Sequence, residues 1–196
     1  MIWFTSDLHL NHENIIGYCN RPFRDVYHMN ESLIENWNMC VDPDDTVWVL
    51  GDLLLGERER GLKELIPRLN GLIYLVPGNH DPCWSGSRGP SKRLYAWRGS
   101  YRDAGIILVE EQKLIEIDID TGIPILLCHF PYAEGDVPRH GDKYNRWRPD
   151  DEGYPLLHGH RHGKKNLNGH MIDVGVDANR YMPISMDEVC NLVEQM

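Results

Sequence analysis

The sequence predicts an α/β fold in which two mixed β-sheets pack face to face between flanking helices, giving four layers in the order α/β/β/α. Three observations predict it. Short apolar runs alternate with helical stripes in the first half, the second half is richer in strand-like runs, and no linker or repeat divides the chain. A chain of 196 residues, 41% of them hydrophobic, is large enough for one packed core. We therefore expect residues 1–196 to form a single domain.

The first half has the pattern of a β-α-β-α-β series. Strands are predicted over residues 2–6, 46–50 and 72–76. The first helical stripe, for which Asn30 is the predicted N-cap, consists of Met29, Leu33, Ile34, Trp37 and Val41. The second stripe, which contains Pro67 and is closed by Asn70-Gly71, consists of Leu62, Leu65, Ile66 and Leu69. This order implies parallel strands joined by helical crossovers.

The second half is predicted to consist mainly of strands. They cover residues 106–109, 112–119, 123–127, 155–157 and 171–176, with a hairpin turn at Thr121-Gly122. A final helix is expected to begin at Ser185, because Ser185 and Glu188 have the spacing of a capping box. Cys128, beside His129 at the end of a predicted strand, should point to the opposite face and into the core.

Two connections, residues 81–99 and 131–154, lack periodicity and have the length of binding loops or lids. The first contains no acidic residue between Pro82 and Gly99. Its basic and aromatic side chains are interleaved: Trp84, Arg88, Lys92, Arg93, Tyr95, Trp97 and Arg98. One hypothesis is a lid that attracts phosphate and stacks on a ring. The alternative is a solvated loop whose tryptophans fill the core.

Composition and charge exclude several classes of protein. The formal net charge of -10 argues against a stable nucleic-acid partner. No apolar run reaches the length of a membrane span, and the N-terminus has no basic segment of the kind that opens a signal peptide. The 5 cysteines are widely spaced without a Cys-x-x-Cys pair, which favours a reducing compartment. We therefore expect a cytoplasmic protein that does not bind membranes.

Five short motifs follow strand-like runs in a fixed order along the chain. They are Asp7-Leu8-His9, Gly51-Asp52, Gly78-Asn79-His80-Asp81, His129 and Gly159-His160-Arg161-His162. Loops at the carboxyl ends of parallel strands meet at one edge of a sheet, so these side chains are expected to converge. They offer carboxylate, amide and imidazole donors without a thiolate, which suits a pair of divalent cations. Asp52, isolated after a glycine, is the candidate for a carboxylate shared by both ions.

The ordered set, spanning residues 7–162, resembles the calcineurin-like metallophosphoesterase superfamily, in particular a small bacterial or phage-type branch. The resemblance assigns one metal to Asp7, His9, Asp52 and His162. It assigns the second metal to Asp52, Asn79, His129 and His160. It leaves His80 unliganded, free to hydrogen-bond the phosphoryl group or protonate the leaving oxygen, with Asp81 orienting it. Two divalent ions are implied, with Mn²⁺ favoured and Fe, Zn²⁺ or Ni²⁺ also compatible with these donors.

The resemblance implies a dinuclear metal-dependent phosphoric ester hydrolase in which a hydroxide held between the metals attacks phosphorus. Residues 51–56 lack the second Asp-Arg pair of phosphoprotein phosphatases, and the chain is short for a dedicated nuclease. We therefore expect a phosphodiesterase for small diesters, cyclic nucleotides included, whose partner is a small phosphate-ester substrate. The alternatives are a broad-specificity phosphomonoesterase and a non-catalytic binding module. The natural substrate and the oligomeric state stay open.

Four further residues lie near the motifs. Asn11 and His12 follow the first motif closely enough to reach substrate, and capping of their own loop is the alternative. Arg21 has the guanidinium that would clamp a phosphate in bidentate fashion, and a surface arginine before a helix is the alternative. For His158 we expect packing or support of the ligands rather than metal ligation.

Overall fold

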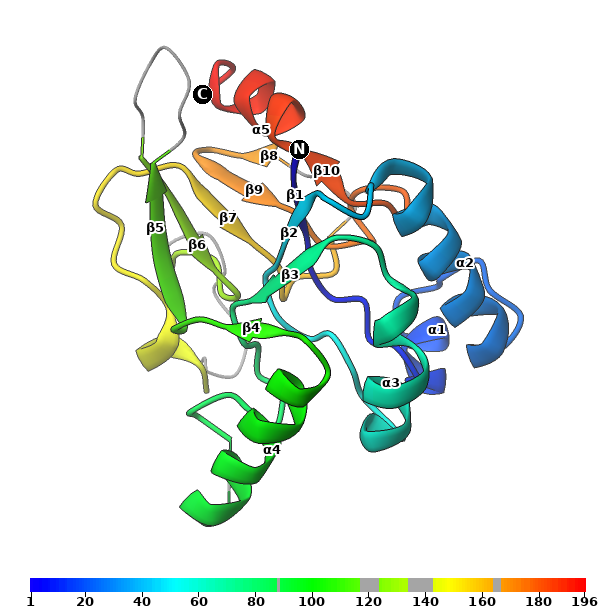
Figure 1. Cartoon of the computed structure of the whole chain (residues 1–196). Helices are drawn as coiled ribbons and strands as arrows, with labels where there is room; N and C mark the ends of the chain where they lie inside the picture. Colours follow the sequence, from blue (N-terminus) through cyan, green and yellow to red (C-terminus); the bar gives the residue numbers. More distant parts are fainter. Residues whose placement is uncertain (88, 117–123, 134–142, 164–166) are drawn as a thin grey trace.

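Two five-stranded mixed sheets form the centre of the molecule, as predicted (Figure 1). The computed structural model describes residues 1–87, 89–116, 124–133, 143–163 and 167–196. The first sheet has the order β10-β1-β2-β3-β4. Its strands are β1 (Ile2–Thr5), β2 (Thr46–Val49), β3 (Leu72–Leu75), β4 (Ile107–Leu108) and β10 (Ile184–Ser185). β1 to β4 run parallel, and only β10 is antiparallel to its neighbour.

The second sheet has the order β5-β6-β7-β9-β8. Its strands are β5 (Gln112–Glu116), β6 (Pro124–Cys128), β7 (Leu156–His158), β8 (Leu167–Asn168) and β9 (Met171–Asp173). β6, β7 and β9 run parallel, while β5 and β8 are antiparallel edge strands. The two-residue strands β8 and β10 were not predicted, because two residues are too short to show alternation. The predicted turn at Thr121-Gly122 lies outside the described residues.

Helices from the first half cover the outer face of the first sheet (Figure 1). They are α1 (Glu13–Tyr18), α2 (Val26–Cys40), α3 (Arg58–Glu64) and the 3₁₀ turn η1 (Ile66–Arg68), which accommodates Pro67. The prediction that Asn30 caps α2 is wrong. Asp25 is the N-cap and accepts a hydrogen bond from the His28 N–H at 2.7 Å, whereas Asn30 is buried inside the helix. α1 was missed because a helix of 6 residues with one buried side chain, Ile15, shows no stripe.

The prediction that residues 81–99 lack regular structure is also wrong, because helix α4 (Ser91–Asp103) begins in their middle. Tyr101 is the one fully buried side chain of α4, so the helix has no apolar stripe that the sequence could show. At the C-terminus, α5 (Met186–Val193) begins with the predicted capping box between Ser185 and Glu188. Within the described ranges, no helix is both long and apolar enough to cross a bilayer.

Alternation along the strands divides the core. Phe4 of β1, Leu127 of β6 and Ile172 of β9 belong to one buried cluster, so the two sheets pack face to face. Cys128 points the other way, into a cluster with Trp84 on the outer face of the second sheet, as its position beside His129 predicted. Burial raises the pKa of the Cys128 thiol to about 12, so it is an inert core residue.

Candidate metal centre

The five motifs meet at the carboxyl ends of β1, β2, β3, β6 and β7. Backbone hydrogen bonds carry the strand pairing into the first two motifs: the Asp7 N–H donates to the Gly51 carbonyl at 3.0 Å, and the His9 N–H donates to the Asp52 carbonyl at 2.9 Å. A parallel bridge between Ser6 and Gly175 joins this edge to the loop after β9. Residues far apart in sequence thus form one rim across both sheets.

The Asp52 carboxylate lies between two imidazoles. Its Oδ2 is 3.6 Å from Nε2 of His9 and 3.6 Å from Nε2 of His129. Its Oδ1 accepts a hydrogen bond from the backbone N–H of His80 at 2.8 Å, which fixes the carboxylate plane. This carboxylate oxygen therefore lies at equal distances from the imidazoles of two candidate ligand residues.

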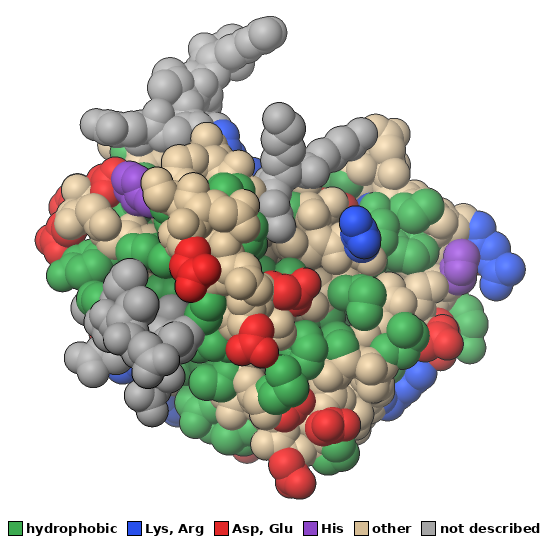
Figure 2. All heavy atoms as spheres, turned by 90° about the horizontal axis from the view of Figure 1, so that it is seen from above, with side chains coloured by type: hydrophobic (Ala, Val, Ile, Leu, Met, Phe, Trp, Pro, Cys, Tyr) green, Lys and Arg blue, Asp and Glu red, His purple; other side chains and the backbone are tan. Residues whose placement is uncertain are grey.

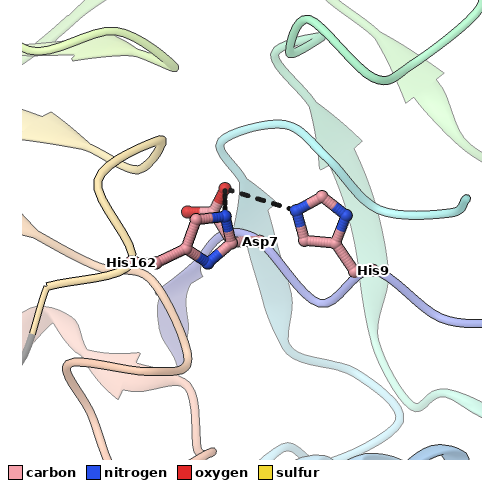
Figure 3. Close-up of side chains that lie close together, drawn as sticks. All are labelled: Asp7, His9 and His162. Atoms are coloured by element: carbon pink, nitrogen blue, oxygen red, sulfur yellow. Dashed lines mark ion pairs between the residues drawn. The ribbon is translucent and has the colours of Figure 1, made fainter. Parts of the chain in front are cut away.

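Asp7 lies close to the imidazoles of His9 and His162 (Figure 3). Its Oδ1 lies 4.0 Å from Nε2 of His9 and 3.9 Å from Nε2 of His162, and the ligand atoms of the three residues lie within 4.8 Å of one another. Within the described residues, Asp7 Oδ1 and both ring nitrogens of His9 are buried without a hydrogen-bond partner. Unpartnered buried polar atoms are costly, and a cation between them would satisfy them. The residues therefore fit a divalent metal ion.

A second group surrounds His129. Its Nε2 lies 3.1 Å from Oδ1 of Asn79, and its ring centroid lies 5.2 Å from that of His160. Ligand atoms of Asp7, Asp52 and His129 also fall within 4.8 Å of one another. The His129 Nδ1 is 2.8 Å from the Leu50 carbonyl, so Nδ1 carries the proton and the Nε2 lone pair is directed at the site.

Five of the converging residues adopt left-handed backbone conformations. Their φ angles are 58° at Asp7, 51° at His9, 55° at Asp52, 72° at His160 and 48° at His162. Asp, Asn and His tolerate this region better than other non-glycine residues, but each instance still costs energy. Such a cluster of strained residues is typical of functional sites, where the surrounding structure holds side chains in a required direction.

At two glycines of the motifs, Gly78 and Gly159, neighbouring chain segments come too close to leave room for a side chain. A Cβ at Gly159 would collide with the Ser6 hydroxyl and the Asp7 carboxylate, and a Cβ at Gly78 would collide with Asp52 and the His129 ring. Neither glycine has a left-handed φ, so the space and not the backbone conformation demands glycine. The absence of a side chain brings the loops close enough for their ligands to share one site.

Burial sets the electrostatics of the rim. Burial, followed by the charges of Asp7 and Asp81, raises the pKa of Asp52 well above its usual value. Burial lowers the pKa of His160 to about 2, with the neighbouring His129 adding to the effect. The carboxylates of the site therefore repel one another, and positive charge from bound cations would relieve that repulsion.

Comparison with known proteins agrees with this geometry. The family described as calcineurin-like phosphoesterase matches residues 1–181. The chain belongs to this family. Membership implies metal-dependent hydrolysis of phosphoesters, for which the family typically uses two divalent metals, and the rim contains the candidate ligand groups for them.

Relatives cover the chain from end to end. A protein named Uncharacterized protein MJ1445, from Methanocaldococcus jannaschii, is 31% identical over 202 residues, covering 99% of this chain and 92% of that protein. A Gene 66 protein of a Mycobacterium phage is 33% identical over 204 residues, covering 99% of this chain and 94% of that protein. The crystal structure of the Aquifex aeolicus protein of unknown function AQ665 superposes with a TM-score of 0.70 at 26% identity, covering 98% of each chain.

Asp81 plays a different part in this calcineurin-like phosphoesterase from the one predicted. Its Oδ2 accepts hydrogen bonds from the backbone N–H groups of Asp52 and Gly78, both at 2.8 Å, and its Oδ1 accepts from the Leu53 N–H at 3.1 Å. Within the described residues, neither oxygen makes a hydrogen bond to the His80 ring that they were expected to orient. Asp81 instead holds the second and third motifs together from beneath.

Arg21 is not placed to clamp a phosphate. Its guanidinium is fully buried and donates to both carboxylate oxygens of Asp177, at 2.9 and 2.8 Å, and to the backbone carbonyls of Asp7 and Leu8. Asp177 also accepts from Nδ1 of His162 at 2.8 Å. The Arg21–Asp177 pair therefore connects the first motif to the last one. Asp177 follows the last motif in the sequence. Its spacing from His162 matches no pattern from which this contact could have been predicted.

Asn11 and His12 separate in the structure. The Asn30 side chain donates to Asn11 Oδ1 at 2.7 Å and accepts from the Asn11 backbone N–H at 3.0 Å, so Asn11 is tied to α2. The His12 ring lies 5.4 Å from that of His9, beside the rim. His158 is buried, with its Nδ1 2.8 Å from the Gly159 carbonyl. Of these three side chains, His12 is the one whose ring lies beside that of His9.

Proposed function

We propose that this protein is a dinuclear metal-dependent phosphodiesterase that hydrolyses small phosphodiesters, cyclic nucleotides included. The observation that carries the proposal is the position of Asp52 Oδ2, 3.6 Å from one imidazole of each ligand group. Asp7, His9, Asp52 and His162 would hold one cation, and Asp52, Asn79, His129 and His160 the other. Mn²⁺ is the favoured ion, because oxygen and imidazole donors are mixed.

Two divalent cations at these positions would lower the pKa of water and neutralise charge on the phosphoryl oxygens. The two cations outweigh the charges of Asp7 and Asp52, so the loaded site is positive and attracts a phosphate ester. The buried rim excludes water from the back of the site, and the Asp81 hydrogen bonds keep its loops from moving apart. The chain thus contributes a rigid, preorganised cradle.

His80 is the residue proposed to act directly on the substrate. Its side chain is exposed at the edge of a cavity that it lines together with Asn79. Desolvation and the neighbouring His129 lower the pKa of the His80 ring to about 4, so the ring is neutral at pH 7. A neutral ring donates a hydrogen bond to a phosphoryl or leaving oxygen without adding charge to the site.

Metal removal tests the proposal. Chelator-stripped protein is titrated with Mn²⁺ while hydrolysis of bis(p-nitrophenyl) phosphate is followed and bound metal is counted. We expect no turnover without metal, and activity that saturates as two ions bind. Bound metal without turnover would favour the non-catalytic binding module, and faster hydrolysis of p-nitrophenyl phosphate than of the diester would favour the phosphomonoesterase.

His80→Gln is expected to lower kcat by about 10²- to 10³-fold, because the flexible glutamine amide does not hold its N–H donor where the imidazole N–H points. Bound metal should stay unchanged, since His80 is outside both proposed ligand sets. The control is His28→Gln at the start of α2, which should retain full activity. A His80→Gln protein with wild-type kcat on the diester would contradict the role assigned to this ring.

The substrate is proposed to be a small molecule in the cytoplasm. The formal net charge of -10 opposes association with nucleic acids and with anionic membrane surfaces. A compact phosphate ester, in contrast, meets the local positive charge of the loaded rim without covering the acidic surface around it.

A further inference from the structure

A cavity of about 570 Å³ adjoins the rim and is lined on its inner side by Asn79 and His80. We propose that this cavity, which we call the ring pocket, binds a flat aromatic ring of the substrate beside basic side chains, so that the preferred substrate is a nucleotide-like phosphoester. Four aromatic side chains line the ring pocket: Trp84, Trp97, Tyr144 and Trp147. The inference rests on the proposed function and names the class of substrate for the same site.

The ring pocket is continuous with the candidate ligands. The Tyr144 ring lies 5.3 Å from that of His160 and stacks on Phe130 at 5.2 Å. Tyr144 thus borders both the rim and the ring pocket, and His80 stands at their junction. A phosphate held at the rim would therefore carry its organic group into the ring pocket.

The aromatic walls are formed in advance. Trp84 is 4% exposed and its ring lies 4.9 Å from that of Trp147. Within the described residues, the Trp84 indole Nε1 is buried and lacks a hydrogen-bond partner. Trp97 lines the pocket from α4, and Trp147 lines it from the 3₁₀ turn η3 (Asn145–Trp147).

The charge of the ring pocket is opposite to that of the chain. Its basic lining residues are Arg58, Arg93, Lys143 and Arg146, and no acidic side chain lines it within the described part of the chain. By contrast, acidic side chains are scattered over the face drawn in Figure 2. Lys143 Nζ lies 4.4 Å from the centre of the Tyr144 ring, and the Arg146 guanidinium lies 5.0 Å from that of Trp147. Rings and cations are therefore presented together, as recognition of a nucleotide requires.

Helix α4, which was not predicted from the sequence, positions part of the lining of the ring pocket. Residues 91–103 form α4, so Arg93 and Trp97 project from a regular scaffold rather than from a loose lid. They lie four positions apart and on one face of the helix, which is the face that lines the ring pocket. Tyr95, 69% exposed, and Lys92 do not line it.

The test compares two diesters: 2′,3′-cyclic AMP, which has a ring, and glycerophosphoethanolamine, which has none. Trp97→Ala should raise KM for 2′,3′-cyclic AMP about 10-fold, the loss expected for one stacking partner. KM for glycerophosphoethanolamine should change less than twofold. Arg93→Ala should also raise KM for cyclic AMP. Tyr95→Ala and Lys92→Ala, from the same helix, are the matched controls and should leave both substrates unchanged.

A binding measurement separates the inference from the proposed function. Calorimetry on the metal-loaded wild-type protein should show tighter binding of AMP than of ribose 5-phosphate, and Trp97→Ala should remove the difference. If neither diester is hydrolysed while this preference persists, the proposed function fails and the ring pocket stands. If both diesters are hydrolysed with equal KM, and Trp97→Ala changes neither KM nor AMP binding, the ring pocket inference is overturned.

Discussion

Asp52→Asn is expected to lower kcat at least about 10³-fold, because it removes the carboxylate proposed to be shared by both metals, and several kcal/mol of transition-state stabilisation with it. The Asn Oδ1 can still accept the hydrogen bond from the His80 N–H, so the fold should persist. We expect fewer than two tightly bound metal ions in the variant, as measured by metal analysis after desalting.

The same substitution should not destabilise the metal-free protein. Burial and the charges of Asp7 and Asp81 raise the pKa of Asp52, so the folded state binds this proton more tightly than the unfolded state. The ionised carboxylate therefore lowers the stability of the folded state as the pH rises above the pKa that Asp52 has in the unfolded state. Asn cannot ionise, so it removes that cost at pH 7.

Thermal melts with chelator at pH 7 should show an equal or higher Tm for Asp52→Asn than for the wild type. The advantage should shrink as pH falls toward the unfolded pKa, where the wild-type carboxyl is protonated in both states. Asp44→Asn, at an exposed acid, is the control and should change neither Tm nor kcat. A large drop in Tm for Asp52→Asn would show that the carboxylate serves the fold rather than the metals.

Arg21→Ala is expected to destabilise the protein by about 3–5 kcal/mol, the cost of leaving one partner of a buried ion pair uncompensated. The side chains are 0% exposed for Arg21 and 5% exposed for Asp177, so solvent cannot replace the lost partner. The Asp7 and Leu8 carbonyls also lose their donor. For a chain of this size, Tm should fall by roughly 6–20 °C.

Arg68→Ala provides the matched control, because Arg68 pairs with Glu31 on the surface, where the side chains are 43% and 36% exposed. Its loss should cost less than about 1 kcal/mol. Both variants are compared by urea unfolding of the metal-free protein. If Arg21→Ala had normal stability and a raised KM for the diester, the result would support the hypothesis from the sequence that Arg21 binds the phosphate.

The elements that could be predicted from the sequence are those with a clear pattern of apolar residues. β1, β2 and β3 are continuous apolar runs, and the stripe of α2 faces a single buried surface, so both stand out from the residues themselves. α4 could not be predicted because one buried side chain, Tyr101, leaves no stripe. The N-cap of α2 was misplaced because Asn30 has a cap-forming side chain that is used elsewhere, in its pairing with Asn11.

The order and chemistry of the five motifs were determined by the sequence alone, since donor type and position after a strand are local properties. Local residues also determined the parallel strands that bring these motifs together. Only the tertiary structure decided the partners of long-range polar contacts. Asp81 lies beside His80 in sequence, but its carboxylate points to the backbone of Asp52 and Gly78.

The same distinction holds for Arg21 and for the ring pocket. Arg21 finds Asp177, 156 residues away, because a buried guanidinium must meet a carboxylate wherever the fold supplies one. The ring pocket joins Trp97 of α4 to Trp147 of η3, which no spacing in the chain relates. Residue type and periodicity determine the secondary structure of a segment and the chemical groups that it carries. Which groups pair with a buried charge, and which side chains fill a cavity, is determined only when distant segments pack together.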